Sequence, residues 1–324
     1  MSQTPIRLRN IFEGAPLDRF GHQRKNEAWV AEQLASPLAR VVPVWRASSL
    51  ISQPREDSAE GGAESAVFPI LIDLGRARAL AGDSPFVLLG LADNAPIFTT
   101  DLSHLESPLE QLGLTDQATF ADLRELASLL DRGDSALLAH ARALTHWHRH
   151  NPFCAKCGGP TLAAQAGHVR KCANADCATQ HFPRTDPAVI MLVTRGDHCL
   201  LARRSGRNPP TYSTLAGFVE PGESLEEAVA REVMEEVGLA VDAVRYQSSQ
   251  PWPFPAQLML GFRAETAQSE CHYHDDEIEE ARWFSRDELR ALFAGGPAGR
   301  HGAINLPRAI SIARRLIGEW VDEA

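Results

Sequence analysis

The C-terminal half of the chain alternates short apolar runs with polar turns. Residues 188–194 and 199–203 flank a polar turn at 195–197 and predict a β-hairpin. Apolar patterning predicts further strands at 211–219, 241–250, 257–265 and 280–284, and closing helices at 287–293 and 304–320. This order of elements favours an α+β fold in which helices sandwich a mixed sheet.

Residues 224–237 predict one amphipathic helix. Ser224 can cap its N-terminus, and Gly238 can end it in a left-handed turn. The valines at 229, 233 and 237 form an apolar stripe that would face a core. Glu232, Glu235 and Glu236 stand at i, i+3 and i+4, so their carboxylates share one face of the helix.

Three carboxylates on one face repel each other unless a cation lies between them. Mg²⁺ and Mn²⁺ prefer oxygen ligands and also bind phosphate oxygens, so the three glutamates are candidate metal ligands and catalytic residues. Such an ion lowers the pKa of a bound water and makes a nucleophile at neutral pH. Arg231 can hold Glu223 or Glu232 by a charge-assisted hydrogen bond.

A glutamate-rich helix is usually a solvated acidic face, and that alternative must be weighed. The flanking residues decide against it. Gly217 and Glu223 precede the helix at fixed spacing, and Gly238 follows the acidic pair 235–236 in register. We call residues 217–239 the glutamate motif.

Four of the six cysteines cluster with the spacing of a metal site, namely Cys154-x2-Cys157-x14-Cys172-x4-Cys177. Four thiolates make a closed tetrahedral Zn²⁺ site with a structural role. Two local disulfides are the rival interpretation, disfavoured because nothing suggests secretion. His150, His168 and His181 lie nearby and could replace a cysteine as ligand.

The chain divides by composition into four parts. Residues 1–115 hold short strand-like pieces without a catalytic motif, and residues 116–150 are rich in Ala and Leu at helical spacing. We therefore expect an N-terminal α+β domain, a helical connection, a zinc ribbon at 151–185, and the domain of the glutamate motif at 186–324.

Charge and hydropathy exclude several classes. The net charge of −10 argues against a protein that coats nucleic acid. The N-terminus has no apolar core of a signal peptide, and the longest strongly apolar run, 188–193, is too short to span a bilayer. We expect a cytoplasmic enzyme without a membrane partner.

A proline-rich segment follows the glutamate motif. Residues 249–260 read SQPWPFPAQLML, and three prolines alternating with Trp252 and Phe254 predict a rigid loop at a strand end. These two aromatic side chains, held on a stiff loop, could stack on a base or a nicotinamide ring at small entropic cost. The alternative is a loop that only packs against its own domain.

Taken together, these motifs resemble the NADH pyrophosphatase (NudC-type) branch of the Nudix hydrolases. The glutamate motif matches the Nudix box at every defined position, and SQPWPFP is the more specific marker of the branch. The resemblance runs from about residue 143 to 317 and includes WHRHNPFCAKCG, HFPRTDPAVIM, EIEEARWF and AISIARRLI. It implies a Nudix fold joined to a zinc ribbon and a degenerate N-terminal α+β domain.

The resemblance also implies an activity. Members hydrolyse NADH and NAD⁺ to NMN(H) and AMP, need Mg²⁺ or Mn²⁺, carry structural zinc and form homodimers. Some also remove NAD caps from RNA 5′ ends. Decapping as the main role is one alternative, and a non-catalytic nucleotide-binding or zinc-ribbon interaction protein is another. The complete glutamate set argues against the non-catalytic alternative.

Residue roles follow by position from the resemblance. Glu277 would be a fourth metal ligand beside the three glutamates of the helix. The residues expected at the substrate are Phe218 stacking on the nicotinamide side, Gln250 and Trp252 in the proline-rich segment, Ala313 through its backbone, and Phe182 reaching into the partner subunit's site. Gln257 stands where the family usually has Ser, so the resemblance carries no ligand contact over to that side chain.

Overall fold

The computed structural model of the chain describes residues 10–53, 67–206, 210–273, 278–295 and 304–323. It divides into two compact units. The C-terminal unit comprises residues 185–252 and 257–324 together with the first eleven residues. The N-terminal unit comprises residues 12–184 and 253–256.

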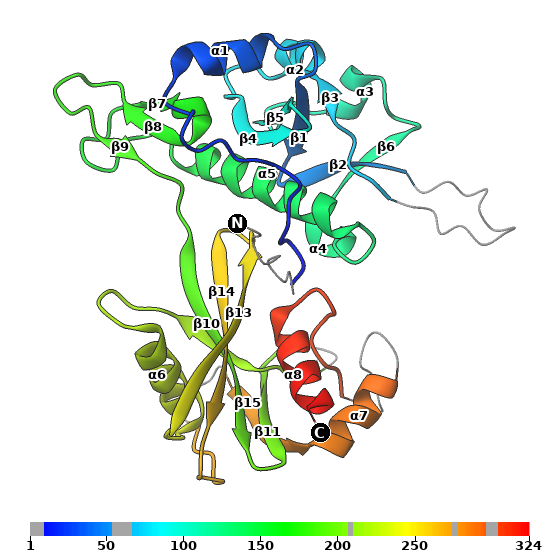
Figure 1. The fold of residues 1–324 in the computed structure, drawn as a ribbon, viewed down its shortest axis with the longest axis vertical. Helices are drawn as coiled ribbons and strands as arrows, with labels where there is room; N and C mark the ends of the chain where they lie inside the picture. The colour runs from blue at the N-terminus through cyan, green and yellow to red at the C-terminus, as the bar shows by residue number, and fades with distance from the viewer. Residues whose placement is uncertain (1–9, 54–66, 207–209, 274–277, 296–303, 324) are drawn as a thin grey trace, which may run out of the picture. The chain divides into compact units, whose positions relative to one another are not determined.

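The C-terminal unit is built on a six-stranded mixed sheet (Figure 1). Its strands are β10 (Asp186–Arg195), β11 (His198–Arg204), β12 (Leu215–Phe218), β13 (Ala243–Trp252), β14 (Gln257–Glu265) and β15 (Ile278–Ser285). The order is β13-β14-β10-β11-β15, with β12 also paired to β10. The β10–β14 pair is parallel, and the other pairs are antiparallel.

Helices cover both faces of this sheet. Alternation along β10 sends Ile190 and Leu192 to one face, where they pack with α7 (Arg286–Ala294) and α8 (Ile312–Asp322). Val189, Met191 and Val193 point to the other face, where they pack with the valines of α6 (Leu225–Val237). Each fully buried aliphatic side chain contributes about 1.5–3 kcal/mol. The predicted sandwich of helices around a mixed sheet is confirmed.

The N-terminal unit contains a second six-stranded sheet. Its strands are β1 (Arg40–Trp45), β2 (Ser48–Ser52), β3 (Ile72–Asp73), β4 (Val87–Ala92), β5 (Ala95–Asp101) and β6 (Ala118–Ala121). Its helices are α1 (Glu27–Ala35), α2 (Leu74–Leu80), α3 (Pro108–Leu112), α4 (Leu123–Leu126) and α5 (Arg132–His150). Across the described parts of both units, every helix is too short or too polar to cross a bilayer.

The two sheets repeat one topology. The order β4-β5-β1-β2-β6, with β3 on β1, becomes the order of the C-terminal sheet when nine is added to each strand number. The parallel pair β1–β5 corresponds to β10–β14. Helix α2 follows β3 as α6 follows β12, but its sequence, LGRARAL, has no glutamate. The N-terminal unit therefore keeps this fold without its acidic helix face.

The repeated topology accounts for a strand where the sequence predicted a helical connection. Residues 116–150 were expected to be a helical connection, yet residues 118–121 form strand β6, which pairs with β2. This strand takes the place of β15 in the repeated topology. Pairing with a neighbouring strand outweighs the local helical tendency of an Ala-rich sequence.

A second correction concerns the proline-rich segment, which was expected to be a loop. Strand β13 continues through Pro251 and Trp252, which pair with Leu258 and Gln257 of β14. Only residues 253–256 form the turn. Strand β13 lies at the edge of the sheet, where a proline without an N–H is tolerated.

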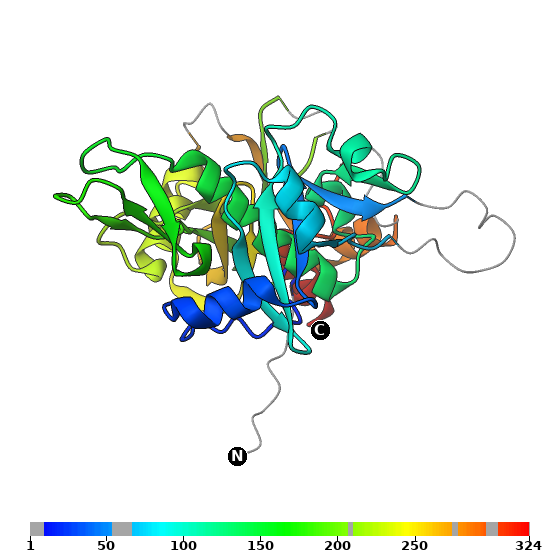
Figure 2. The ribbon, with the colours of Figure 1, turned by 90° about the horizontal axis from the view of Figure 1, so that it is seen from above.

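A small separate sheet is formed by residues that follow the first large sheet and precede the second in the sequence; it is bright green in Figure 2. It consists of β7 (Thr161–Ala164), β8 (Val169–Cys172) and β9 (Gln180–His181), with a short 3-10 helix at Gln165–Gly167. All three strands are antiparallel. The predicted ribbon is present, and it carries the four clustered cysteines, of which Cys172 ends β8 and the other three lie outside its strands.

Candidate active site

Helix α6 begins and ends as its sequence predicts. The Glu227 N–H donates to Ser224 Oγ at 3.3 Å, and the Ser224 N–H donates to Glu227 Oε2 at 2.8 Å. At the other end, Gly238 adopts a φ of +70°, and a Cβ there would lie 2.7 Å from the His272 carbonyl oxygen. Only glycine fits this position, so the helix stops where the acidic face ends.

Arg231 organises the acidic face. Its Nε and Nη2 donate to the two carboxylate oxygens of Glu223 at 2.6 and 2.9 Å. Its Nη1 donates to Glu232 and Glu235, both at 2.9 Å, and Nη2 also donates to the Phe218 carbonyl at 2.8 Å. The hydrogen bond from this guanidinium lowers the pKa of Glu223 to about 2. The predicted contact of Arg231 with Glu223 and Glu232 is present with both partners.

Gly217 is required by close packing. A Cβ at this position would lie 1.8 Å from Cδ of Glu232 and within 2.0 Å of both its carboxylate oxygens. Gly217 pairs with Val189 of β10, so its backbone is fixed in the sheet. The carboxylate of Glu232 therefore lies directly against the strand backbone, and any side chain at 217 would displace it.

Glu236 is the most buried of the three glutamates. Its side chain is 9% exposed, and its Oε1 accepts a hydrogen bond of 3.1 Å from Nη2 of Arg204. The Arg204 side chain is 49% exposed. Arg204 was not among the residues expected at the site, although alternation from the buried Leu200 and Ala202 on β11 places it on the α6 face.

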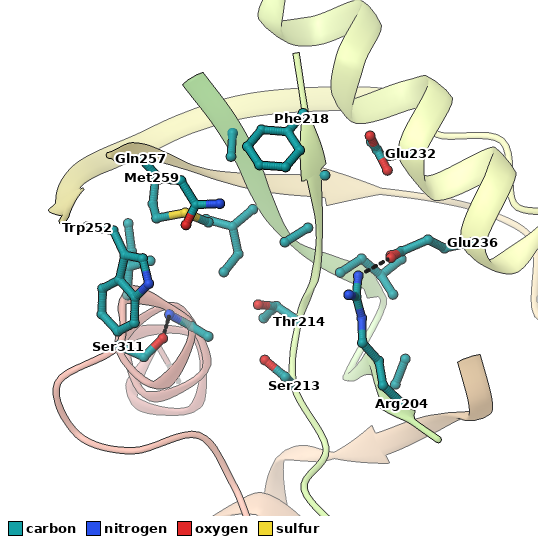
Figure 3. A pocket seen from close by; sticks show the side chains of 18 of the residues that line it. Arg204, Ser213, Thr214, Phe218, Glu232, Glu236, Trp252, Gln257, Met259 and Ser311 are labelled. Carbon is teal, nitrogen blue, oxygen red and sulfur yellow. Dashed lines mark hydrogen bonds and ion pairs between the residues drawn. The ribbon is translucent and has the colours of Figure 1, made fainter. Parts of the chain in front are cut away.

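These groups line a pocket of about 650 Å³ in the C-terminal unit. In Figure 3, Arg204, Glu232 and Glu236 lie on one side, and Trp252, Gln257, Met259 and Ser311 lie on the other. The ring of Phe218, which is 54% exposed, stands between the two sides. The volume is in the range of small-molecule sites, about 300–1,000 Å³.

Most of the predicted site residues meet in this pocket. Its lining includes Gly217, Phe218, Arg231, Glu232, Glu235, Glu236, Gln250, Trp252 and Ala313. Glu223 is ion-paired to Arg231 and is not part of the lining, and Gly238 ends helix α6. Glu277 lies outside the described residues, and Phe182, which is 65% exposed, belongs to the N-terminal unit. The roles assigned to these residues stay predictions.

The Gln250 amide is hydrogen-bonded to three backbone groups. Its side chain is fully buried, and its Nε2 donates to the carbonyls of Ile310 at 2.8 Å and Ile11 at 3.2 Å. Its Oε1 accepts from the Ile312 N–H at 2.8 Å. The amide thus fixes the start of α8, where Ala313 meets the pocket, and its predicted contact with substrate stays a prediction.

Two pocket hydroxyls were not anticipated. Ser213 and Thr214 precede β12 and line the pocket beside the acidic side (Figure 3). Thr214 is 6% exposed, and its Oγ1 has no hydrogen-bond partner among the described residues. A buried hydroxyl without a partner is costly, so Thr214 is a candidate to hydrogen-bond a ligand.

The charged groups of the pocket fit a hard divalent cation. Four carboxylates and two guanidinium groups line it, which gives a formal charge of −2, from Glu220, Glu232, Glu235, Glu236, Arg204 and Arg231. Carboxylate oxygens are the ligands that Mg²⁺ and Mn²⁺ prefer. Within the described part of the chain, however, the glutamate oxygens are not gathered within 4.8 Å of one another as the cysteine sulfurs are.

The four clustered cysteines fit Zn²⁺. Their sulfur atoms all lie within 4.8 Å of one another, with Cys154 to Cys177 at 3.8 Å and Cys157 to Cys172 at 3.4 Å. A Zn–S bond of about 2.3 Å implies tetrahedral S···S edges of about 3.8 Å. None of the six cysteines, all of which lie in the described part of the chain, forms a disulfide, so the disulfide alternative is wrong.

The nearby histidines leave this set of four cysteines intact. His181 Nε2 lies 3.2 Å from the Cys154 sulfur and can hydrogen-bond it. His168 bonds the Leu88 carbonyl, and His150 bonds the His146 carbonyl. None of the three histidines is needed to complete the shell.

Three family models match successive parts of the chain. The model of the NUDIX domain matches residues 184–302. The NADH pyrophosphatase-like rudimentary NUDIX domain matches residues 38–147, which agrees with the repeated topology. The NADH pyrophosphatase zinc ribbon domain matches residues 149–182, the segment that holds the four cysteines.

Curated relatives carry the name "NAD-capped RNA hydrolase NudC". The protein from Mycobacterium bovis (strain BCG / Pasteur 1173P2) is 47% identical over 207 residues, covering 63% of this chain and 66% of its own length, just under two thirds. The protein from Stutzerimonas stutzeri (strain A1501) is 45% identical over 213 residues, covering 66% and 74%. Among solved structures, a NUDIX hydrolase from Nitrosomonas europaea is 23% identical, covers 42% of this chain and 79% of its own, and has a TM-score of 0.35.

Proposed function

Because the chain belongs to the NudC family of Nudix hydrolases, we propose that it hydrolyses the diphosphate bond of NADH and NAD⁺ to NMN(H) and AMP. Water adds across one P–O bond of the diphosphate, so one product phosphate gains the oxygen of water and the other keeps the bridging oxygen. The observation that carries this proposal is the meeting of the three glutamates with an aromatic wall in one pocket.

The acidic side of the pocket suits the reacting diphosphate. Glu232, Glu235 and Glu236 would hold Mg²⁺ or Mn²⁺, with Glu277 as a further ligand. A bound divalent cation supplies charge neutralisation and a nucleophilic water at neutral pH. Arg231 keeps two of these carboxylates oriented through its Nη1. Each of the three remains a candidate for the group that accepts the proton of the attacking water.

The other side of the pocket suits the rings of a dinucleotide. Phe218 and Trp252 offer aromatic faces, and stacking on each would contribute on the order of 1 kcal/mol. Thr214 offers a buried hydroxyl to a polar group of the substrate. These walls support a ligand with an aromatic group on at least one side of the diphosphate.

NAD-capped RNA is a second candidate substrate, favoured by the name that the relatives carry. A pocket that holds NAD with its adenosine 3′ end facing outward would accept both the free dinucleotide and the capped RNA. The net charge of −10 weakly favours the small molecule. A purely non-catalytic binder would have no need of the complete glutamate set.

The exposed apolar side chains of the zinc ribbon bear on how the chain assembles. We propose a homodimer with composite sites, in which the exposed Phe182 of one subunit reaches the site of the other. Phe153 and Leu162 of the same ribbon are also 65% and 64% exposed, which supports an interface there. Cysteines that form no disulfide are typical of a reducing compartment, and this supports the cytoplasm.

Product analysis tests the activity. Zinc-loaded protein with Mg²⁺ or Mn²⁺ is incubated separately with NADH, ADP-ribose and NAD-capped RNA. We expect NMNH and AMP from NADH, and weaker turnover of ADP-ribose, which has no nicotinamide ring to stack. Comparable or greater turnover of NAD-capped RNA would favour decapping as the main role. Release of nicotinamide, or no cleavage with either metal, would refute the proposal.

A further inference from the structure

Gln257 is the first residue of β14, an interior strand of the C-terminal sheet. Strand alternation puts Gln257, Met259 and Gly261 on one face of β14. A Cβ at Gly261 would lie 2.8 Å from Cδ1 of Ile312, so this is the face that α8 covers. Figure 3 shows the Gln257 amide directed into the pocket beside Met259, and both residues belong to the pocket lining.

The register of the sheet makes room for a flat ring between Phe218 and Trp252. Ala188 of β10 is opposite Phe218 of β12 on one side and Met259 of β14 on the other, and Gln257 is opposite Trp252 of β13. Residues opposite each other share a face of the sheet, and neighbouring strands lie about 4.8 Å apart. The backbones of Phe218 and Met259 are therefore about 10 Å apart, with only the small side chain of Ala188 between them. A ring stacked on Phe218 would lie over Ala188 with its far edge toward Gln257.

The cationic groups of the pocket are on its acidic side, away from this ring position. Of the described lining residues, the two arginines are Arg204, which pairs with Glu236, and Arg231, which pairs with Glu232 and Glu235. The lining around Gln257 is apolar or neutral and includes Ala188, Trp252, Met259, Ser311 and Ile312. A charged substituent on the ring would lose its water here without gaining a counter-ion, whereas a neutral polar group can be satisfied by a neutral amide.

The Gln257 amide offers a donor and an acceptor to a ligand. The side chain is partly exposed, and within the described part of the chain its amide makes no hydrogen bond to another residue. The other amide of the lining, Gln250, is already bonded to three backbone groups. A carboxamide presents one donor and one acceptor in the reverse order, so it can form two hydrogen bonds with Gln257. A carboxylate can only accept, so one of its oxygens would face the Gln257 carbonyl oxygen unfavourably.

We propose that Gln257 is a specificity-determining residue, which hydrogen-bonds the carboxamide of a nicotinamide ring stacked on Phe218. The enzyme then prefers dinucleotides with a nicotinamide ring to those whose ring carries a carboxylate at the same position. Gln257 acts in substrate binding and takes no part in the attack on the diphosphate, which belongs to the acidic side. The inference rests on the proposed function, because it assigns the nicotinamide half of that substrate to this side of the pocket.

Three substrates test this specificity. NAD⁺ carries the carboxamide, nicotinic acid adenine dinucleotide carries a carboxylate in its place, and ADP-ribose has no ring at this end. Steady-state kinetics with Mn²⁺ are measured for the zinc-loaded full chain as wild type, Gln257→Ser and Gln257→Lys. The wild type should have a higher kcat/KM for NAD⁺ than for the carboxylate analogue.

Each variant has its own expected pattern. In Gln257→Ser, the ratio of kcat/KM for NAD⁺ to that for the analogue should fall about tenfold, which corresponds to about 1.4 kcal/mol. The loss should appear as a higher KM for NAD⁺ at nearly unchanged kcat, because the contact is made equally before and during the reaction. Turnover of ADP-ribose should be the same in Gln257→Ser and the wild type. Gln257→Lys should reverse the preference, because its ammonium group can pair with the carboxylate of the analogue.

Gln247→Ser is the matched control. Gln247 lies on the adjacent strand β13, is partly exposed like Gln257, and does not belong to the pocket lining. Its Nε2 donates to the Arg245 carbonyl at 3.4 Å on the same strand. This variant should have the kinetics of the wild type with all three substrates. If Gln247→Ser changes the ratio as much as Gln257→Ser does, the specificity does not come from the pocket and the inference fails.

Two results would overturn the inference alone. One is a ratio that stays at the wild-type value in both Gln257→Ser and Gln257→Lys. The other is an equal loss with all three substrates in Gln257→Ser, which would mean a damaged pocket wall or an adenine at this position. A wild type that cleaves none of the three substrates would overturn the proposed function as well.

Discussion

Replacing Gly217 with alanine tests the geometry of the acidic site with one methyl group. The new Cβ would lie 1.8 Å from Cδ of Glu232, whereas real Cβ contacts are essentially never shorter than 3.0 Å. The backbone of Gly217 is held by its pairing with Val189 on the central strand β10. The carboxylate of Glu232 must therefore move by more than about 1 Å, which is enough to cost on the order of 10²-fold in rate.

The same change should cost a moderate amount of stability. Moving Glu232 breaks its bond of 2.9 Å to Arg231, and a charge-assisted hydrogen bond contributes about 1.5–3 kcal/mol. No positive φ is involved at Gly217, so steric displacement is the whole effect. We expect kcat for NADH to fall about 10²-fold and the free energy of unfolding to fall by about 1–3 kcal/mol.

Gly318→Ala is the control for this measurement. Gly318 lies inside helix α8, and a Cβ there would meet only Phe293 ring atoms at 3.6 Å, an ordinary contact. Alanine in a helix interior stabilises by about 0.5–1 kcal/mol relative to glycine, so this variant should be slightly more stable and fully active. Wild-type kcat/KM in Gly217→Ala would refute the close packing of Glu232 against the strand.

Four further outcomes are expected. Glu236→Gln should nearly abolish NADH turnover with the fold intact by circular dichroism, because an amide cannot replace the charge of a ligand or base; full activity would exclude this site. Cys154→Ser should lower zinc below about one per chain and reduce thermal stability, since a closed four-thiolate site is structural; unchanged zinc content would contradict this. Phe182→Ala should weaken NADH turnover at unchanged zinc, and mixing it with Glu236→Gln chains should restore part of the activity if the sites are composite; a monomer by sedimentation would exclude the idea. Burial lowers the pKa of His140 to about 3 and of His148 to about 4. Because the unfolded chain takes up these protons more readily than the folded one, the free energy of unfolding falls as the pH drops below about 6.5, the ordinary pKa of histidine. Urea unfolding near pH 5 should show a loss of up to about 2 kcal/mol per histidine relative to pH 7, and pH-independent stability would refute it.

Local sequence was sufficient where local interactions decide the structure. The limits of α6 depend on Ser224, Glu227 and Gly238, which act within a few residues, and the helix was predicted with its correct ends. The same holds for the cysteine cluster, because two short-spaced pairs on one ribbon converge through their turns. The fold class followed from the alternation of apolar positions, which is also a local signal.

Other features depend on partners that are distant in the chain. Residues 118–121 form a strand because β2 offers an edge, and Pro251 stays in a strand because β13 is itself an edge. The Arg204–Glu236 pair joins residues 32 positions apart across a strand and a helix. Spacing alone does not reveal such contacts, since they need the register of the sheet and the packing of α6 upon it.

The central claim is that this pocket hydrolyses the diphosphate of NADH. The most direct measurement is turnover of NADH in H₂¹⁸O with Mn²⁺, followed by mass spectrometry of the products of the wild type and Glu236→Gln. The account predicts one ¹⁸O in the phosphate of either AMP or NMNH, no free nicotinamide, and almost no product from the variant. Free nicotinamide, ¹⁸O absent from both phosphates, or equal product from the variant would contradict it.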